Sequence, residues 1–537
     1  MAATTPVSYA PAADALPTVP ALAGVGSAND AEYDAVVFVT GDASKPGAVP
    51  EPIGALLPQL VAVRRRGAVH VDKAVSSSVT LHHVQGVSGS RLIVSPTGPL
   101  DRCQDDVRAL FDAAEKGVAR AKAAGATAPI IVADPNLEGA GFPKAQEVLV
   151  LGAAFAQYSP LQTREFKGAA VAQPIVKLGF LPLPSAADKL PALLTRLAGM
   201  ELGRRVARDI CGADPARMTN LNAAEYVKAV FAGVPGVTIT CTTALDEVKA
   251  GYPCAYAVAR ASELNPLHHP AILRVEYKGA GPIEKQVFFA GKGITYDTGG
   301  ADIKAGGIMA GMKHDCGGAA AAAGFMRSVA ELAPAGLRAV AYLGFVRNDV
   351  GSTMYVADEI ITSHAGKRVL VVNTDAEGRM VMCDLLSHIR EEILGDYAAG
   401  PGAGIPTTVH SIATLTGHAV IAYGVYNICL DNGVSKAAGV SQALVQAGDA
   451  IADPFEVSTL RREDFAVVTP RVRDDHDFPA AFLAMASGLA EHGTANKDTP
   501  IAYTHLDIAG SASHGDSATG VETGNPVPAL VEHYIPA

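Results

Sequence analysis

The chain has 537 residues, of which 49% are hydrophobic and 18% charged, and its formal net charge is -11. This length predicts two or three domains, and this composition excludes a largely disordered protein. The acidic balance argues against nucleic acid as the main partner, because binding to phosphates needs clustered lysines and arginines.

The first 33 residues are rich in Ala, Pro, Thr and Val and contain no Lys or Arg. A secretory signal needs a basic start and a mitochondrial transit peptide needs arginines, so neither is expected. We interpret this segment as a flexible or loosely docked N-terminal extension. No apolar run reaches about 18 residues without a charge or turn signal, so no membrane span is expected. The seven cysteines lack CxxC and CxxH spacing, which favours reduced thiols in a cytoplasmic protein.

Residues 34–184 alternate between strand and helix patterns, which predicts an N-terminal α/β domain. The strands are expected at Ala35–Thr40, Val79–Val84, Arg91–Pro96, Pro129–Ala133 and Pro174–Phe180, and a helix at Asp105–Ala124. A proline-rich turn at residues 181–184 then predicts a domain boundary. The helical pattern of Ala186–Cys211, within residues 185–219, predicts a connector between two domains.

Residues 220–537 predict a second, larger α/β domain. Its strands are expected at Val237–Thr242, Ala271–Tyr277, Gln286–Thr295, Arg338–Val346, Lys367–Val372, Thr407–Leu415 and Ile501–Ile508. Its helices are expected at Asn222–Phe231, Gly317–Leu332, Met380–Leu394, Lys436–Ala452 and Pro479–Glu491. Apolar strands separated by helices indicate a mostly central sheet that is covered on both faces.

Two short, glycine-punctuated clusters of charged residues follow predicted strands of this domain, where ligands gather in open α/β sheets. Buried charge is costly unless it is paired or bound to metal. Hard oxygen ligands suit divalent cations, and four carboxylates carry more charge than one such ion needs and can neutralise two. A structural salt-bridge cluster is the alternative. The seven charged residues are Lys292, Asp297, Lys304, Asp315, Asp375, Glu377 and Arg379.

Other kinds of catalytic motif are weak or missing. The chain has neither GxxxxGK[ST] nor a well-formed GxGxxG, and the lone Gly291-Lys292-Gly293 is weak evidence for a nucleotide site. HExxH and GxSxG do not occur, which excludes a helix-borne zinc protease site and a nucleophile elbow. We interpret Cys316 and Cys383 as packing residues. We interpret three histidines near the motifs as structural: His314, His418 and His505.

Together these motifs resemble the leucyl aminopeptidase family of two-metal exopeptidases. The resemblance is carried by the run Gly291–Gly318, the heptapeptide Asn373–Arg379, Ala413–Gly417 and His505–Gly510, and is clear from about Asn220 onward. It implies a smaller N-terminal α/β (macro-like) domain and a larger catalytic domain with a central mixed sheet. It also implies peptide substrates and a cytoplasmic homohexamer built as a dimer of trimers.

The resemblance implies a role for each site residue. Asp297 and Glu377 would bridge two divalent ions, Zn or Mn, with Mg or Co as alternatives, and a water between the ions would attack the peptide bond. Lys292 and Asp315 would complete the tighter site, and Asp375 the more exchangeable one. The remaining roles are polarisation of the scissile carbonyl by Lys304, binding of a bicarbonate proton shuttle by Arg379, and substrate binding by Met312, Thr414, Leu415 and Gly417.

The chain departs from the family pattern at the segment Phe345–Tyr355, at Ser411, where an aspartate is usual, and beside Asp315, at His314 and Cys316. None of these departures removes a predicted ligand. We therefore expect a metal-dependent aminopeptidase that releases an N-terminal residue, Leu or another apolar residue by family default. The alternative is a catalytically weak paralogue that acts as a hexameric scaffold or binding protein.

Overall fold

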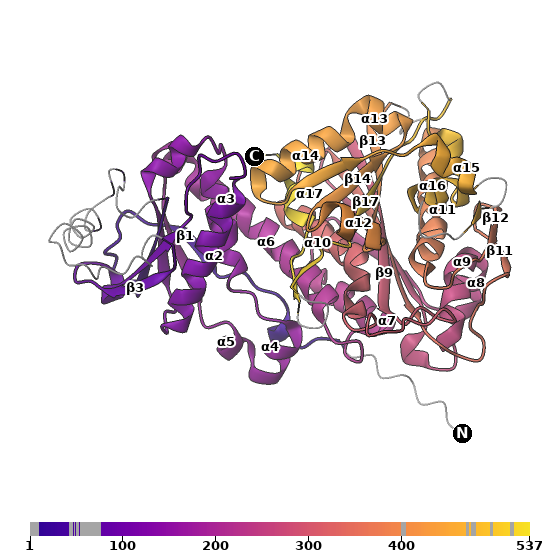
Figure 1. Cartoon of the computed structure of the whole chain (residues 1–537), viewed down its shortest axis with the longest axis horizontal. Coiled ribbons are helices and arrows are strands. Elements are labelled where there is room, and N and C mark those ends of the chain that lie inside the picture. The colour runs from indigo at the N-terminus through magenta and orange to yellow at the C-terminus, as the bar shows by residue number, and fades with distance from the viewer. Residues whose placement is uncertain are drawn as a thin grey trace.

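The computed structural model of the chain describes residues 10–41, 47, 49, 53, 77–398, 404–468, 472–473, 479–494, 498–515 and 520–536. Two α/β bodies lie on either side of a long helix, α6 (Leu190–Gly212) (Figure 1). All seven cysteines belong to the described residues and are free thiols. Within the same residues, every helix is too short or too polar to cross a membrane.

The N-terminal body contains a six-stranded sheet in the order β1-β6-β5-β2-β4-β3, which is parallel except for β3. Its strands are β1 (Ala21–Gly24), β2 (Ala35–Thr40), β3 (Thr80–His83), β4 (Arg91–Pro96), β5 (Pro129–Ala133) and β6 (Lys177–Leu181). Its helices are α2 (Arg108–Ala123), α3 (Ala145–Phe155), α4 (Leu161–Lys167) and α5 (Ala169–Ala172). The α/β alternation predicted for this part of the chain is confirmed.

Part of the segment predicted to be a flexible extension belongs to this sheet, so that prediction was wrong for those residues. Strand β1 pairs in parallel with β6, with Ala21 opposite Lys177 and Gly24 opposite Phe180. Ala15 is buried in the main core. The four residues of β1 are too few to show a periodic pattern, which explains why the sequence did not reveal the strand. The first nine residues of the predicted extension lie outside the described residues.

The larger body contains an eight-stranded mixed sheet in the order β15-β14-β17-β13-β9-β10-β8-β7. Its central strands β17, β13, β9 and β10 are parallel, whereas β14 and β8 run antiparallel to their inner neighbours. The strands are β7 (Val237–Thr242), β8 (Ala271–Lys278), β9 (Lys285–Asp297), β10 (Leu337–Asn348), β13 (Thr407–Ala413), β14 (Asn427–Asp431), β15 (Phe455–Ser458) and β17 (Ala502–Asp507). The predicted mixed α/β architecture is confirmed.

Helices cover both faces of the larger sheet (Figure 1). Alternate side chains of β9 enter different cores: Val287 and Phe289 pack with α10, and Phe288 and Ala290 pack with α11. The helices of this body are α7 (Asn220–Val230), α8 (Leu245–Gly251), α9 (Pro253–Ala259), α10 (Gly317–Leu332), α11 (Glu377–Ala398), α12 (Gly417–Tyr423), α13 (Gly433–Ala438), α14 (Val440–Ile451), α15 (Arg462–Val468), α16 (Pro479–Ala486) and α17 (Val527–Tyr534).

Two predictions for this body need correction, and several strands were missed. The strand expected at Lys367–Val372 is short, β12 (Arg368–Leu370), and lies outside the main sheet, with β11 (Ile360–Thr362) and β16 (Val472–Arg473). The helix expected at Lys436–Ala452 is split into α13 and α14 by Gly439, whose φ is 70°. Strand β14 and the edge strand β15 were not predicted, and a two-stranded ribbon, β18 (Ser513–His514) with β19 (Val521–Glu522), was also missed.

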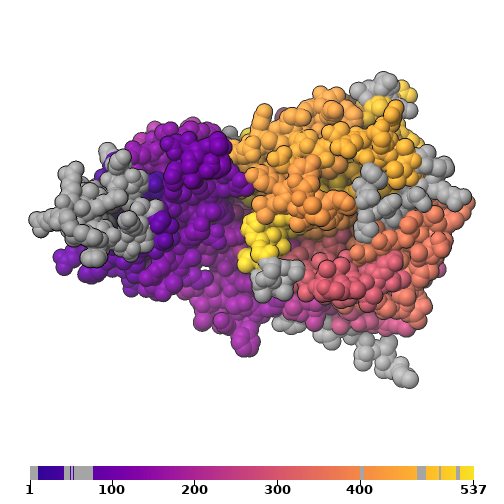
Figure 2. All heavy atoms as spheres, in the orientation of Figure 1, coloured from indigo at the N-terminus to yellow at the C-terminus, as the bar shows by residue number. Residues whose placement is uncertain are grey.

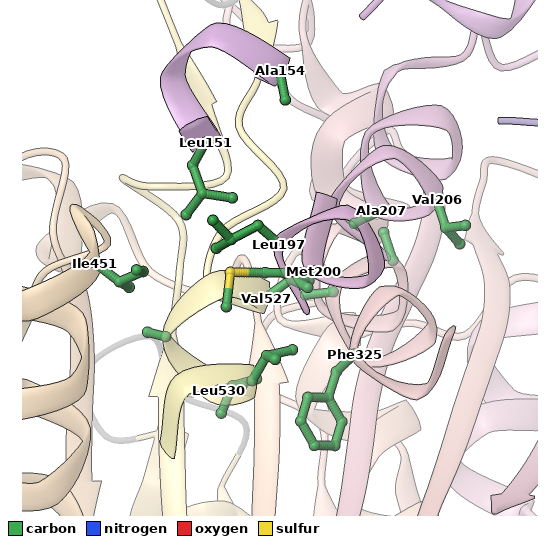
Figure 3. Close-up of a cluster of buried hydrophobic side chains, with 14 of the residues drawn as sticks. Leu151, Ala154, Leu197, Met200, Val206, Ala207, Phe325, Ile451, Val527 and Leu530 are labelled. Carbon is green, nitrogen blue, oxygen red and sulfur yellow. The ribbon is translucent and has the colours of Figure 1, made fainter. Parts of the chain in front are cut away.

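Helix α6 joins the two bodies through close packing on α10. A Cβ atom on Gly203 would lie 2.2 Å from the carbonyl oxygen of Gly324, so glycine is needed where the two helices cross. Figure 3 shows Leu197 and Met200 of α6 in the hydrophobic cluster around this crossing, which also contains Phe325 and residues of α17. In the space-filling view, yellow C-terminal residues are exposed between the two bodies (Figure 2).

Candidate functional site

Six of the predicted charged residues meet at one end of the larger sheet, and one of them, Lys304, lies in the loop after β9. Lys292 lies within β9 and Asp297 ends it, while Asp315 lies in the short turn Met312–Cys316 that leads into α10. Asp375 precedes α11, and Glu377 is its first residue. Glu377 and Arg379 therefore lie in the first helical turn and not in the turn that was expected before Met380. The first charged segment thus lies at the carboxyl end of β9, as predicted, whereas the second lies at the start of α11 and follows no strand of the main sheet.

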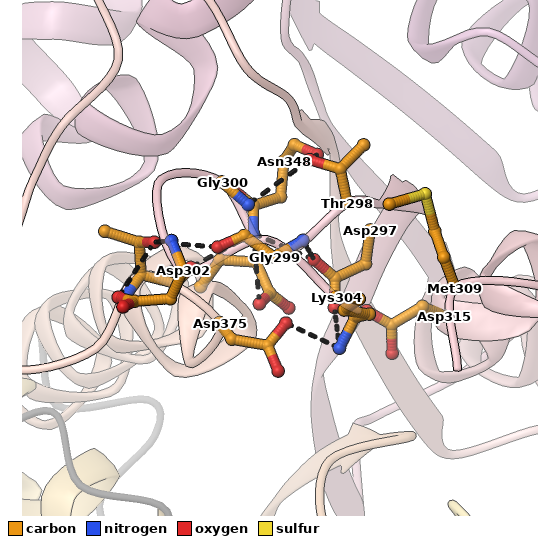
Figure 4. A network of polar contacts seen from close by, with 12 residues as sticks. Asp297, Thr298, Gly299, Gly300, Asp302, Lys304, Met309, Asp315, Asn348 and Asp375 are labelled. Atoms are coloured by element: carbon orange, nitrogen blue, oxygen red, sulfur yellow. Dashed lines mark hydrogen bonds and ion pairs between the residues drawn. The ribbon is translucent and has the colours of Figure 1, made fainter. Parts of the chain in front are cut away.

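Two lysines pair with four carboxylates in this group, which we call the carboxylate cluster: Lys292, Asp297, Lys304, Asp315, Asp375 and Glu377. Lys292 Nζ lies 2.7 Å from an oxygen of Asp315 and 3.0 Å from one of Glu377. Lys304 Nζ lies 2.9 Å from Asp297 and 2.5 Å from Asp375 (Figure 4). One oxygen each of Asp297, Asp375 and Glu377 lie within 4.8 Å of one another.

The carboxylate cluster carries more negative charge than its two lysines can neutralise. Its four carboxylates face two ammonium groups, so two negative charges are in excess when all the groups are ionised. Burial and the neighbouring Asp297 carboxylate raise the pKa of Glu377 and of Asp375. Burial opposes the charge on Lys292, yet the carboxylates of Asp315 and Glu377 raise its pKa. Such a group of oxygens gains stability from protons or, more effectively, from cations.

The residues present fit divalent cations. Asp315 Oδ2 is buried and has no hydrogen-bond partner among the described residues, although its Oδ1 accepts bonds from Lys292 and from Thr414 Oγ1. A buried carboxylate oxygen without a donor is costly unless a cation lies against it. Carboxylate oxygens and a lysine amine can ligate Zn, Mn, Co or Mg, and the cluster offers enough negative charge for two such ions.

Two residues that support the cluster were not predicted from the sequence, Asn348 and Asp302 (Figure 4). Asn348 ends β10, and its amide donates to Asp297 Oδ1 at 2.8 Å and to the carbonyl of Thr374 at 3.0 Å. Asp302 Oδ2 accepts from the backbone N–H of Thr374 at 2.8 Å, which joins the two charged loops. A polar residue at the end of an apolar strand was the available signal for Asn348, but it lies in the segment that departs from the family pattern.

Glycine brings α11 close to Lys292. A Cβ atom on Gly378 would lie 2.2 Å from Lys292 Cε, so any side chain there would displace the lysine. Gly299 has a φ of 88°, and its Cβ would lie 2.4 Å from the carbonyl oxygen of Asp302. The glycines of both motifs therefore have steric roles beside the charged groups.

Arg379 is buried behind the cluster in the first turn of α11, with a relative exposure of 1%. Its guanidinium carbon lies 5.9 Å from the centre of the Phe482 ring. Burial, together with the charge of Arg379, lowers the pKa of His505 to about 3. Arg379 is the one predicted charged residue that does not line the cleft described next or belong to the ion pairs above.

A cleft of about 550 Å³ opens over the carboxylate cluster. Its lining includes every residue that was predicted to bind substrate: Met312, Thr414, Leu415 and Gly417. Ile308, Val420 and Val425 add an apolar wall, and their exposed fractions are 61%, 47% and 45%. Residues 509–510 and 512–515 form a further wall that the sequence did not predict, because they lie about 100 positions after the other lining segments.

Two of the three histidines near the motifs, His314 and His505, are buried and hydrogen-bonded, as a structural role predicts. His314 Nε2 lies 3.1 Å from Glu522 Oε1. His505 Nδ1 lies 2.8 Å from Ser411 Oγ, which also lies 2.8 Å from the Tyr503 hydroxyl. Ser411, which departs from the family pattern, is therefore accommodated in a buried hydrogen-bonded network. His418 is exposed on α12.

Comparisons with known proteins agree with this geometry. Residues 205–531 match the model of the catalytic domain of the cytosol aminopeptidase family. A Caenorhabditis elegans protein, provisionally named an aminopeptidase, is 36% identical over 94% of this chain and 95% of its own length. A provisionally named cytosol aminopeptidase of Acidovorax sp. is 34% identical over 66% of each chain.

The fold is also similar to a solved structure, that of the bottromycin maturation enzyme BotP. The two share 20% sequence identity with a TM-score of 0.70, over 93% of this chain and 98% of BotP. A second structure, of BotP in complex with Mn, gives a TM-score of 0.69 at 21% identity. At this identity the similarity concerns the fold alone.

Proposed function

The chain belongs to the cytosol aminopeptidase family and is a metal-dependent peptidase, and from that premise we propose that it releases N-terminal residues from peptides with two bound divalent cations. The observation that carries this proposal is the negative excess of the carboxylate cluster at the floor of an open cleft. A cluster with a purely structural role has no physical reason to collect carboxylates that repel one another.

We assign the cations to the predicted ligands. Asp297 and Glu377 would be shared by both ions, with Lys292 and Asp315 at one ion and Asp375 at the other. When bound, the ions would act as Lewis acids that make water a nucleophile near neutral pH. The carboxylates would neutralise the ions, and Lys292 would have to release its proton before its amine could ligate. Zn or Mn are the proposed metals, and Mn agrees with the ion present in the BotP complex.

Lys304 is the proposed electrophilic catalyst. Its ammonium lies between Asp297 and Asp375, and those carboxylates raise its pKa despite its burial, so it stays protonated at neutral pH. With the carboxylates engaged by cations, Lys304 can donate hydrogen bonds to the scissile carbonyl and stabilise its developing negative charge. Arg379 would supply the positive charge that holds a bicarbonate ion as proton shuttle.

The cleft supports a preference for an apolar N-terminal side chain, such as Leu. Met312, Leu415 and Ile308 give its wall apolar surface, while its carboxylates can attract the free amino group of a peptide. An internal peptide bond has no such amine, which would restrict the enzyme to exopeptidase action. We further propose a cytoplasmic homohexamer, built as a dimer of trimers, with an N-terminal domain that extends the predicted residues 34–184 to include β1, and a catalytic domain at residues 220–537.

Hydrolysis of a panel of aminoacyl-amide fluorogenic substrates, with Mn²⁺ or Zn²⁺ added to metal-stripped protein, tests the proposal. Leucyl and other apolar substrates should be hydrolysed fastest, EDTA should abolish the reaction, and Asp375→Ala should be inactive while remaining folded. Absence of metal-dependent turnover on every substrate would contradict the enzyme and support the scaffold alternative.

A further inference from the structure

A second group of metal-ligating side chains lies on the outer part of α11. It consists of His364, His388 and Glu391, and one ligand atom from each lies within 4.8 Å of the others. His388 and Glu391 are one helical turn apart, so they project from the same side of α11. His364 comes from the turn between β11 and β12. At 1.5 Å per residue, His388 lies about 16 Å along the helix from Glu377, which separates this group from the carboxylate cluster.

A neighbouring carbonyl fixes which nitrogen of His388 is available, and a hydroxyl occupies one nitrogen of His364. His388 Nε2 lies 2.8 Å from the carbonyl oxygen of Gly251, which can only accept, so Nε2 carries the proton and Nδ1 keeps its lone pair. His364 Nδ1 lies 2.9 Å from Ser387 Oγ, and its Nε2 faces Glu391 Oε2 at 3.9 Å. The backbone N–H of His364 also donates to Asp384 Oδ1 at 2.9 Å. Histidines that ligate metals typically have their other ring nitrogen held in this way.

The group is also electrically and sterically suited to a cation. Burial lowers the pKa of His388, so its ring is neutral at pH 7 and can ligate. The Glu391 side chain is 51% exposed, which gives an ion a path from solvent, and an ion would compete for its carboxylate with Arg390, whose Nη2 lies 3.7 Å from Oε1. The two rings are stacked with centroids 3.9 Å apart and planes 22° apart. An ion would replace this stacking after a rotation of a ring about its Cβ–Cγ bond, a torsion with a broad energy minimum.

We propose that His364, His388 and Glu391 bind a divalent cation of the zinc class at a structural site separate from the carboxylate cluster. Two imidazoles and one carboxylate leave a fourth position for water in a tetrahedral zinc site. Imidazole favours Zn, Cu and Ni, whereas a set of carboxylates suits Mn or Mg better. The ion would join the β11–β12 turn to α11. This inference does not rest on the proposed function, since it concerns other residues and its test does not measure catalysis.

Zinc binding by the metal-stripped full chain tests the proposal. Equilibrium dialysis against micromolar Zn²⁺ should leave one more equivalent of zinc on the wild type than on His388→Gln, His364→Gln or Glu391→Gln. His83→Gln, at an exposed histidine of β3, is the matched control and should keep the wild-type count. Glu391→Gln changes an exposed side chain and so should leave the fold intact. Equal zinc counts in the wild type and all three variants would overturn the proposal.

A spectroscopic measurement separates this site from the carboxylate cluster. Cu²⁺ added at one equivalent should give an electron paramagnetic resonance spectrum with coupling to two imidazole nitrogens, and His388→Gln should lose that coupling. Ser387→Ala removes the partner of His364 Nδ1 and should weaken Zn²⁺ binding about 10-fold or more. A copper spectrum without imidazole coupling in the wild type would contradict the site.

Discussion

Glu201 and Glu377 are both buried at the start or middle of a long helix, yet their surroundings affect them in opposite ways. Burial opposes the charge on Glu201, but Arg204 and Arg205 outweigh it and lower the pKa of Glu201. Burial and the Asp297 carboxylate raise the pKa of Glu377, and the opposing effect of the Lys292 charge is too small to cancel this rise. The carboxylate of Glu201 is stabilised by neighbouring arginines, whereas that of Glu377 has too little positive charge around it among the described residues.

The region around Glu201, which we call the arginine network, has an excess of cations: Arg164, Arg204, Arg205 and Arg208 with Glu201 and Asp209. Backbone carbonyls absorb part of that excess. Arg205 donates to the carbonyls of Thr18 and Ala154, and Arg204 to that of Leu151. Backbone oxygens thus accept bonds from these arginines, whereas Asp315 Oδ2 of the carboxylate cluster is buried and has no hydrogen-bond donor among the described residues. We therefore interpret the arginine network as structural and the carboxylate cluster as a cation site.

Removal of a charge from the arginine network should give the largest loss of stability. Asp209→Ala leaves Arg164 buried without its carboxylate partner, to which it donates at 3.0 Å, and also removes the acceptor of the Tyr226 hydroxyl. We expect the free energy of unfolding to fall by about 3–5 kcal/mol, measured by urea denaturation of the metal-loaded protein. Glu32→Gln, which breaks the exposed Lys177–Glu32 pair, is the control and should cost less than about 1 kcal/mol. Equal losses of stability in Asp209→Ala and Glu32→Gln would contradict the structural role of the arginine network.

Removal of a lysine from the carboxylate cluster should affect catalysis instead. Lys304→Met deletes the proposed donor to the scissile carbonyl, and kcat should fall about 10²–10³-fold with little change in the unfolding midpoint of the metal-loaded protein. Lys313→Met is the matched control, because Lys313 donates to the carbonyl of Gly212 and does not line the cleft. A kcat for Lys304→Met within threefold of the wild type would exclude the assigned role.

A steric change can displace Lys292 without removing any charge. Gly378→Ala places a Cβ 2.2 Å from Lys292 Cε, and we expect metal affinity to fall about 10–100-fold, as measured by titration with Mn²⁺. Gly395→Ala lies in the same helix with open space around it, and it should leave affinity unchanged while adding about 0.5–1 kcal/mol of stability. If both variants bind metal as the wild type does, the position of Lys292 is not important for binding.

The two glutamates should give opposite pH dependence in the metal-free protein. The pKa of Glu377 is raised in the folded state, so the folded wild type binds a proton more tightly than the unfolded chain does. Relative to Glu377→Gln, the wild type should therefore gain stability as the pH falls toward 4.5 and lose that stability as the pH rises through the folded pKa. The lowered pKa of Glu201 makes wild type gain stability relative to Glu201→Gln above 4.5, and lose it as pH falls through the folded pKa. The difference in free energy of unfolding between the wild type and each variant should change by up to about 1.4 kcal/mol per pH unit, as measured by denaturation in EDTA. Slopes of the same sign would contradict the comparison.

Much of the fold could be predicted from the sequence because apolar strands and long amphipathic helices have strong periodic signals. Helix α10 and strands β2, β4, β5 and β7 have the bounds that were expected. The short strands β1, β14 and β15 were missed, because four or five residues leave little periodic pattern. The position of β12 in a separate sheet depends on its pairing with distant residues, which a local pattern cannot reveal.

The charged residues of the site could be predicted because their density on glycine turns is locally visible. Asn348, Asp302 and the wall at residues 512–515 could not, because their role comes from contacts between distant segments. The bonds of Ser411 to Tyr503 and His505 likewise join residues that are more than 90 positions apart. The sequence prediction therefore failed for residues whose role depends on tertiary contacts, and not for residues whose chemistry is visible in a local motif.

The central claim is that external cations balance the carboxylate cluster, and the stability of the protein as a function of Mn²⁺ concentration tests it most directly. In EDTA, Glu377→Gln should be more stable than the wild type, because it removes a carboxylate from an overcharged group. With added Mn²⁺ the wild type should gain stability, about 2.7 kcal/mol at a concentration 100 times the Kd, and Glu377→Gln should gain much less. A wild type that gains no stability from Mn²⁺, together with a variant that is less stable than the wild type in EDTA, would contradict the account.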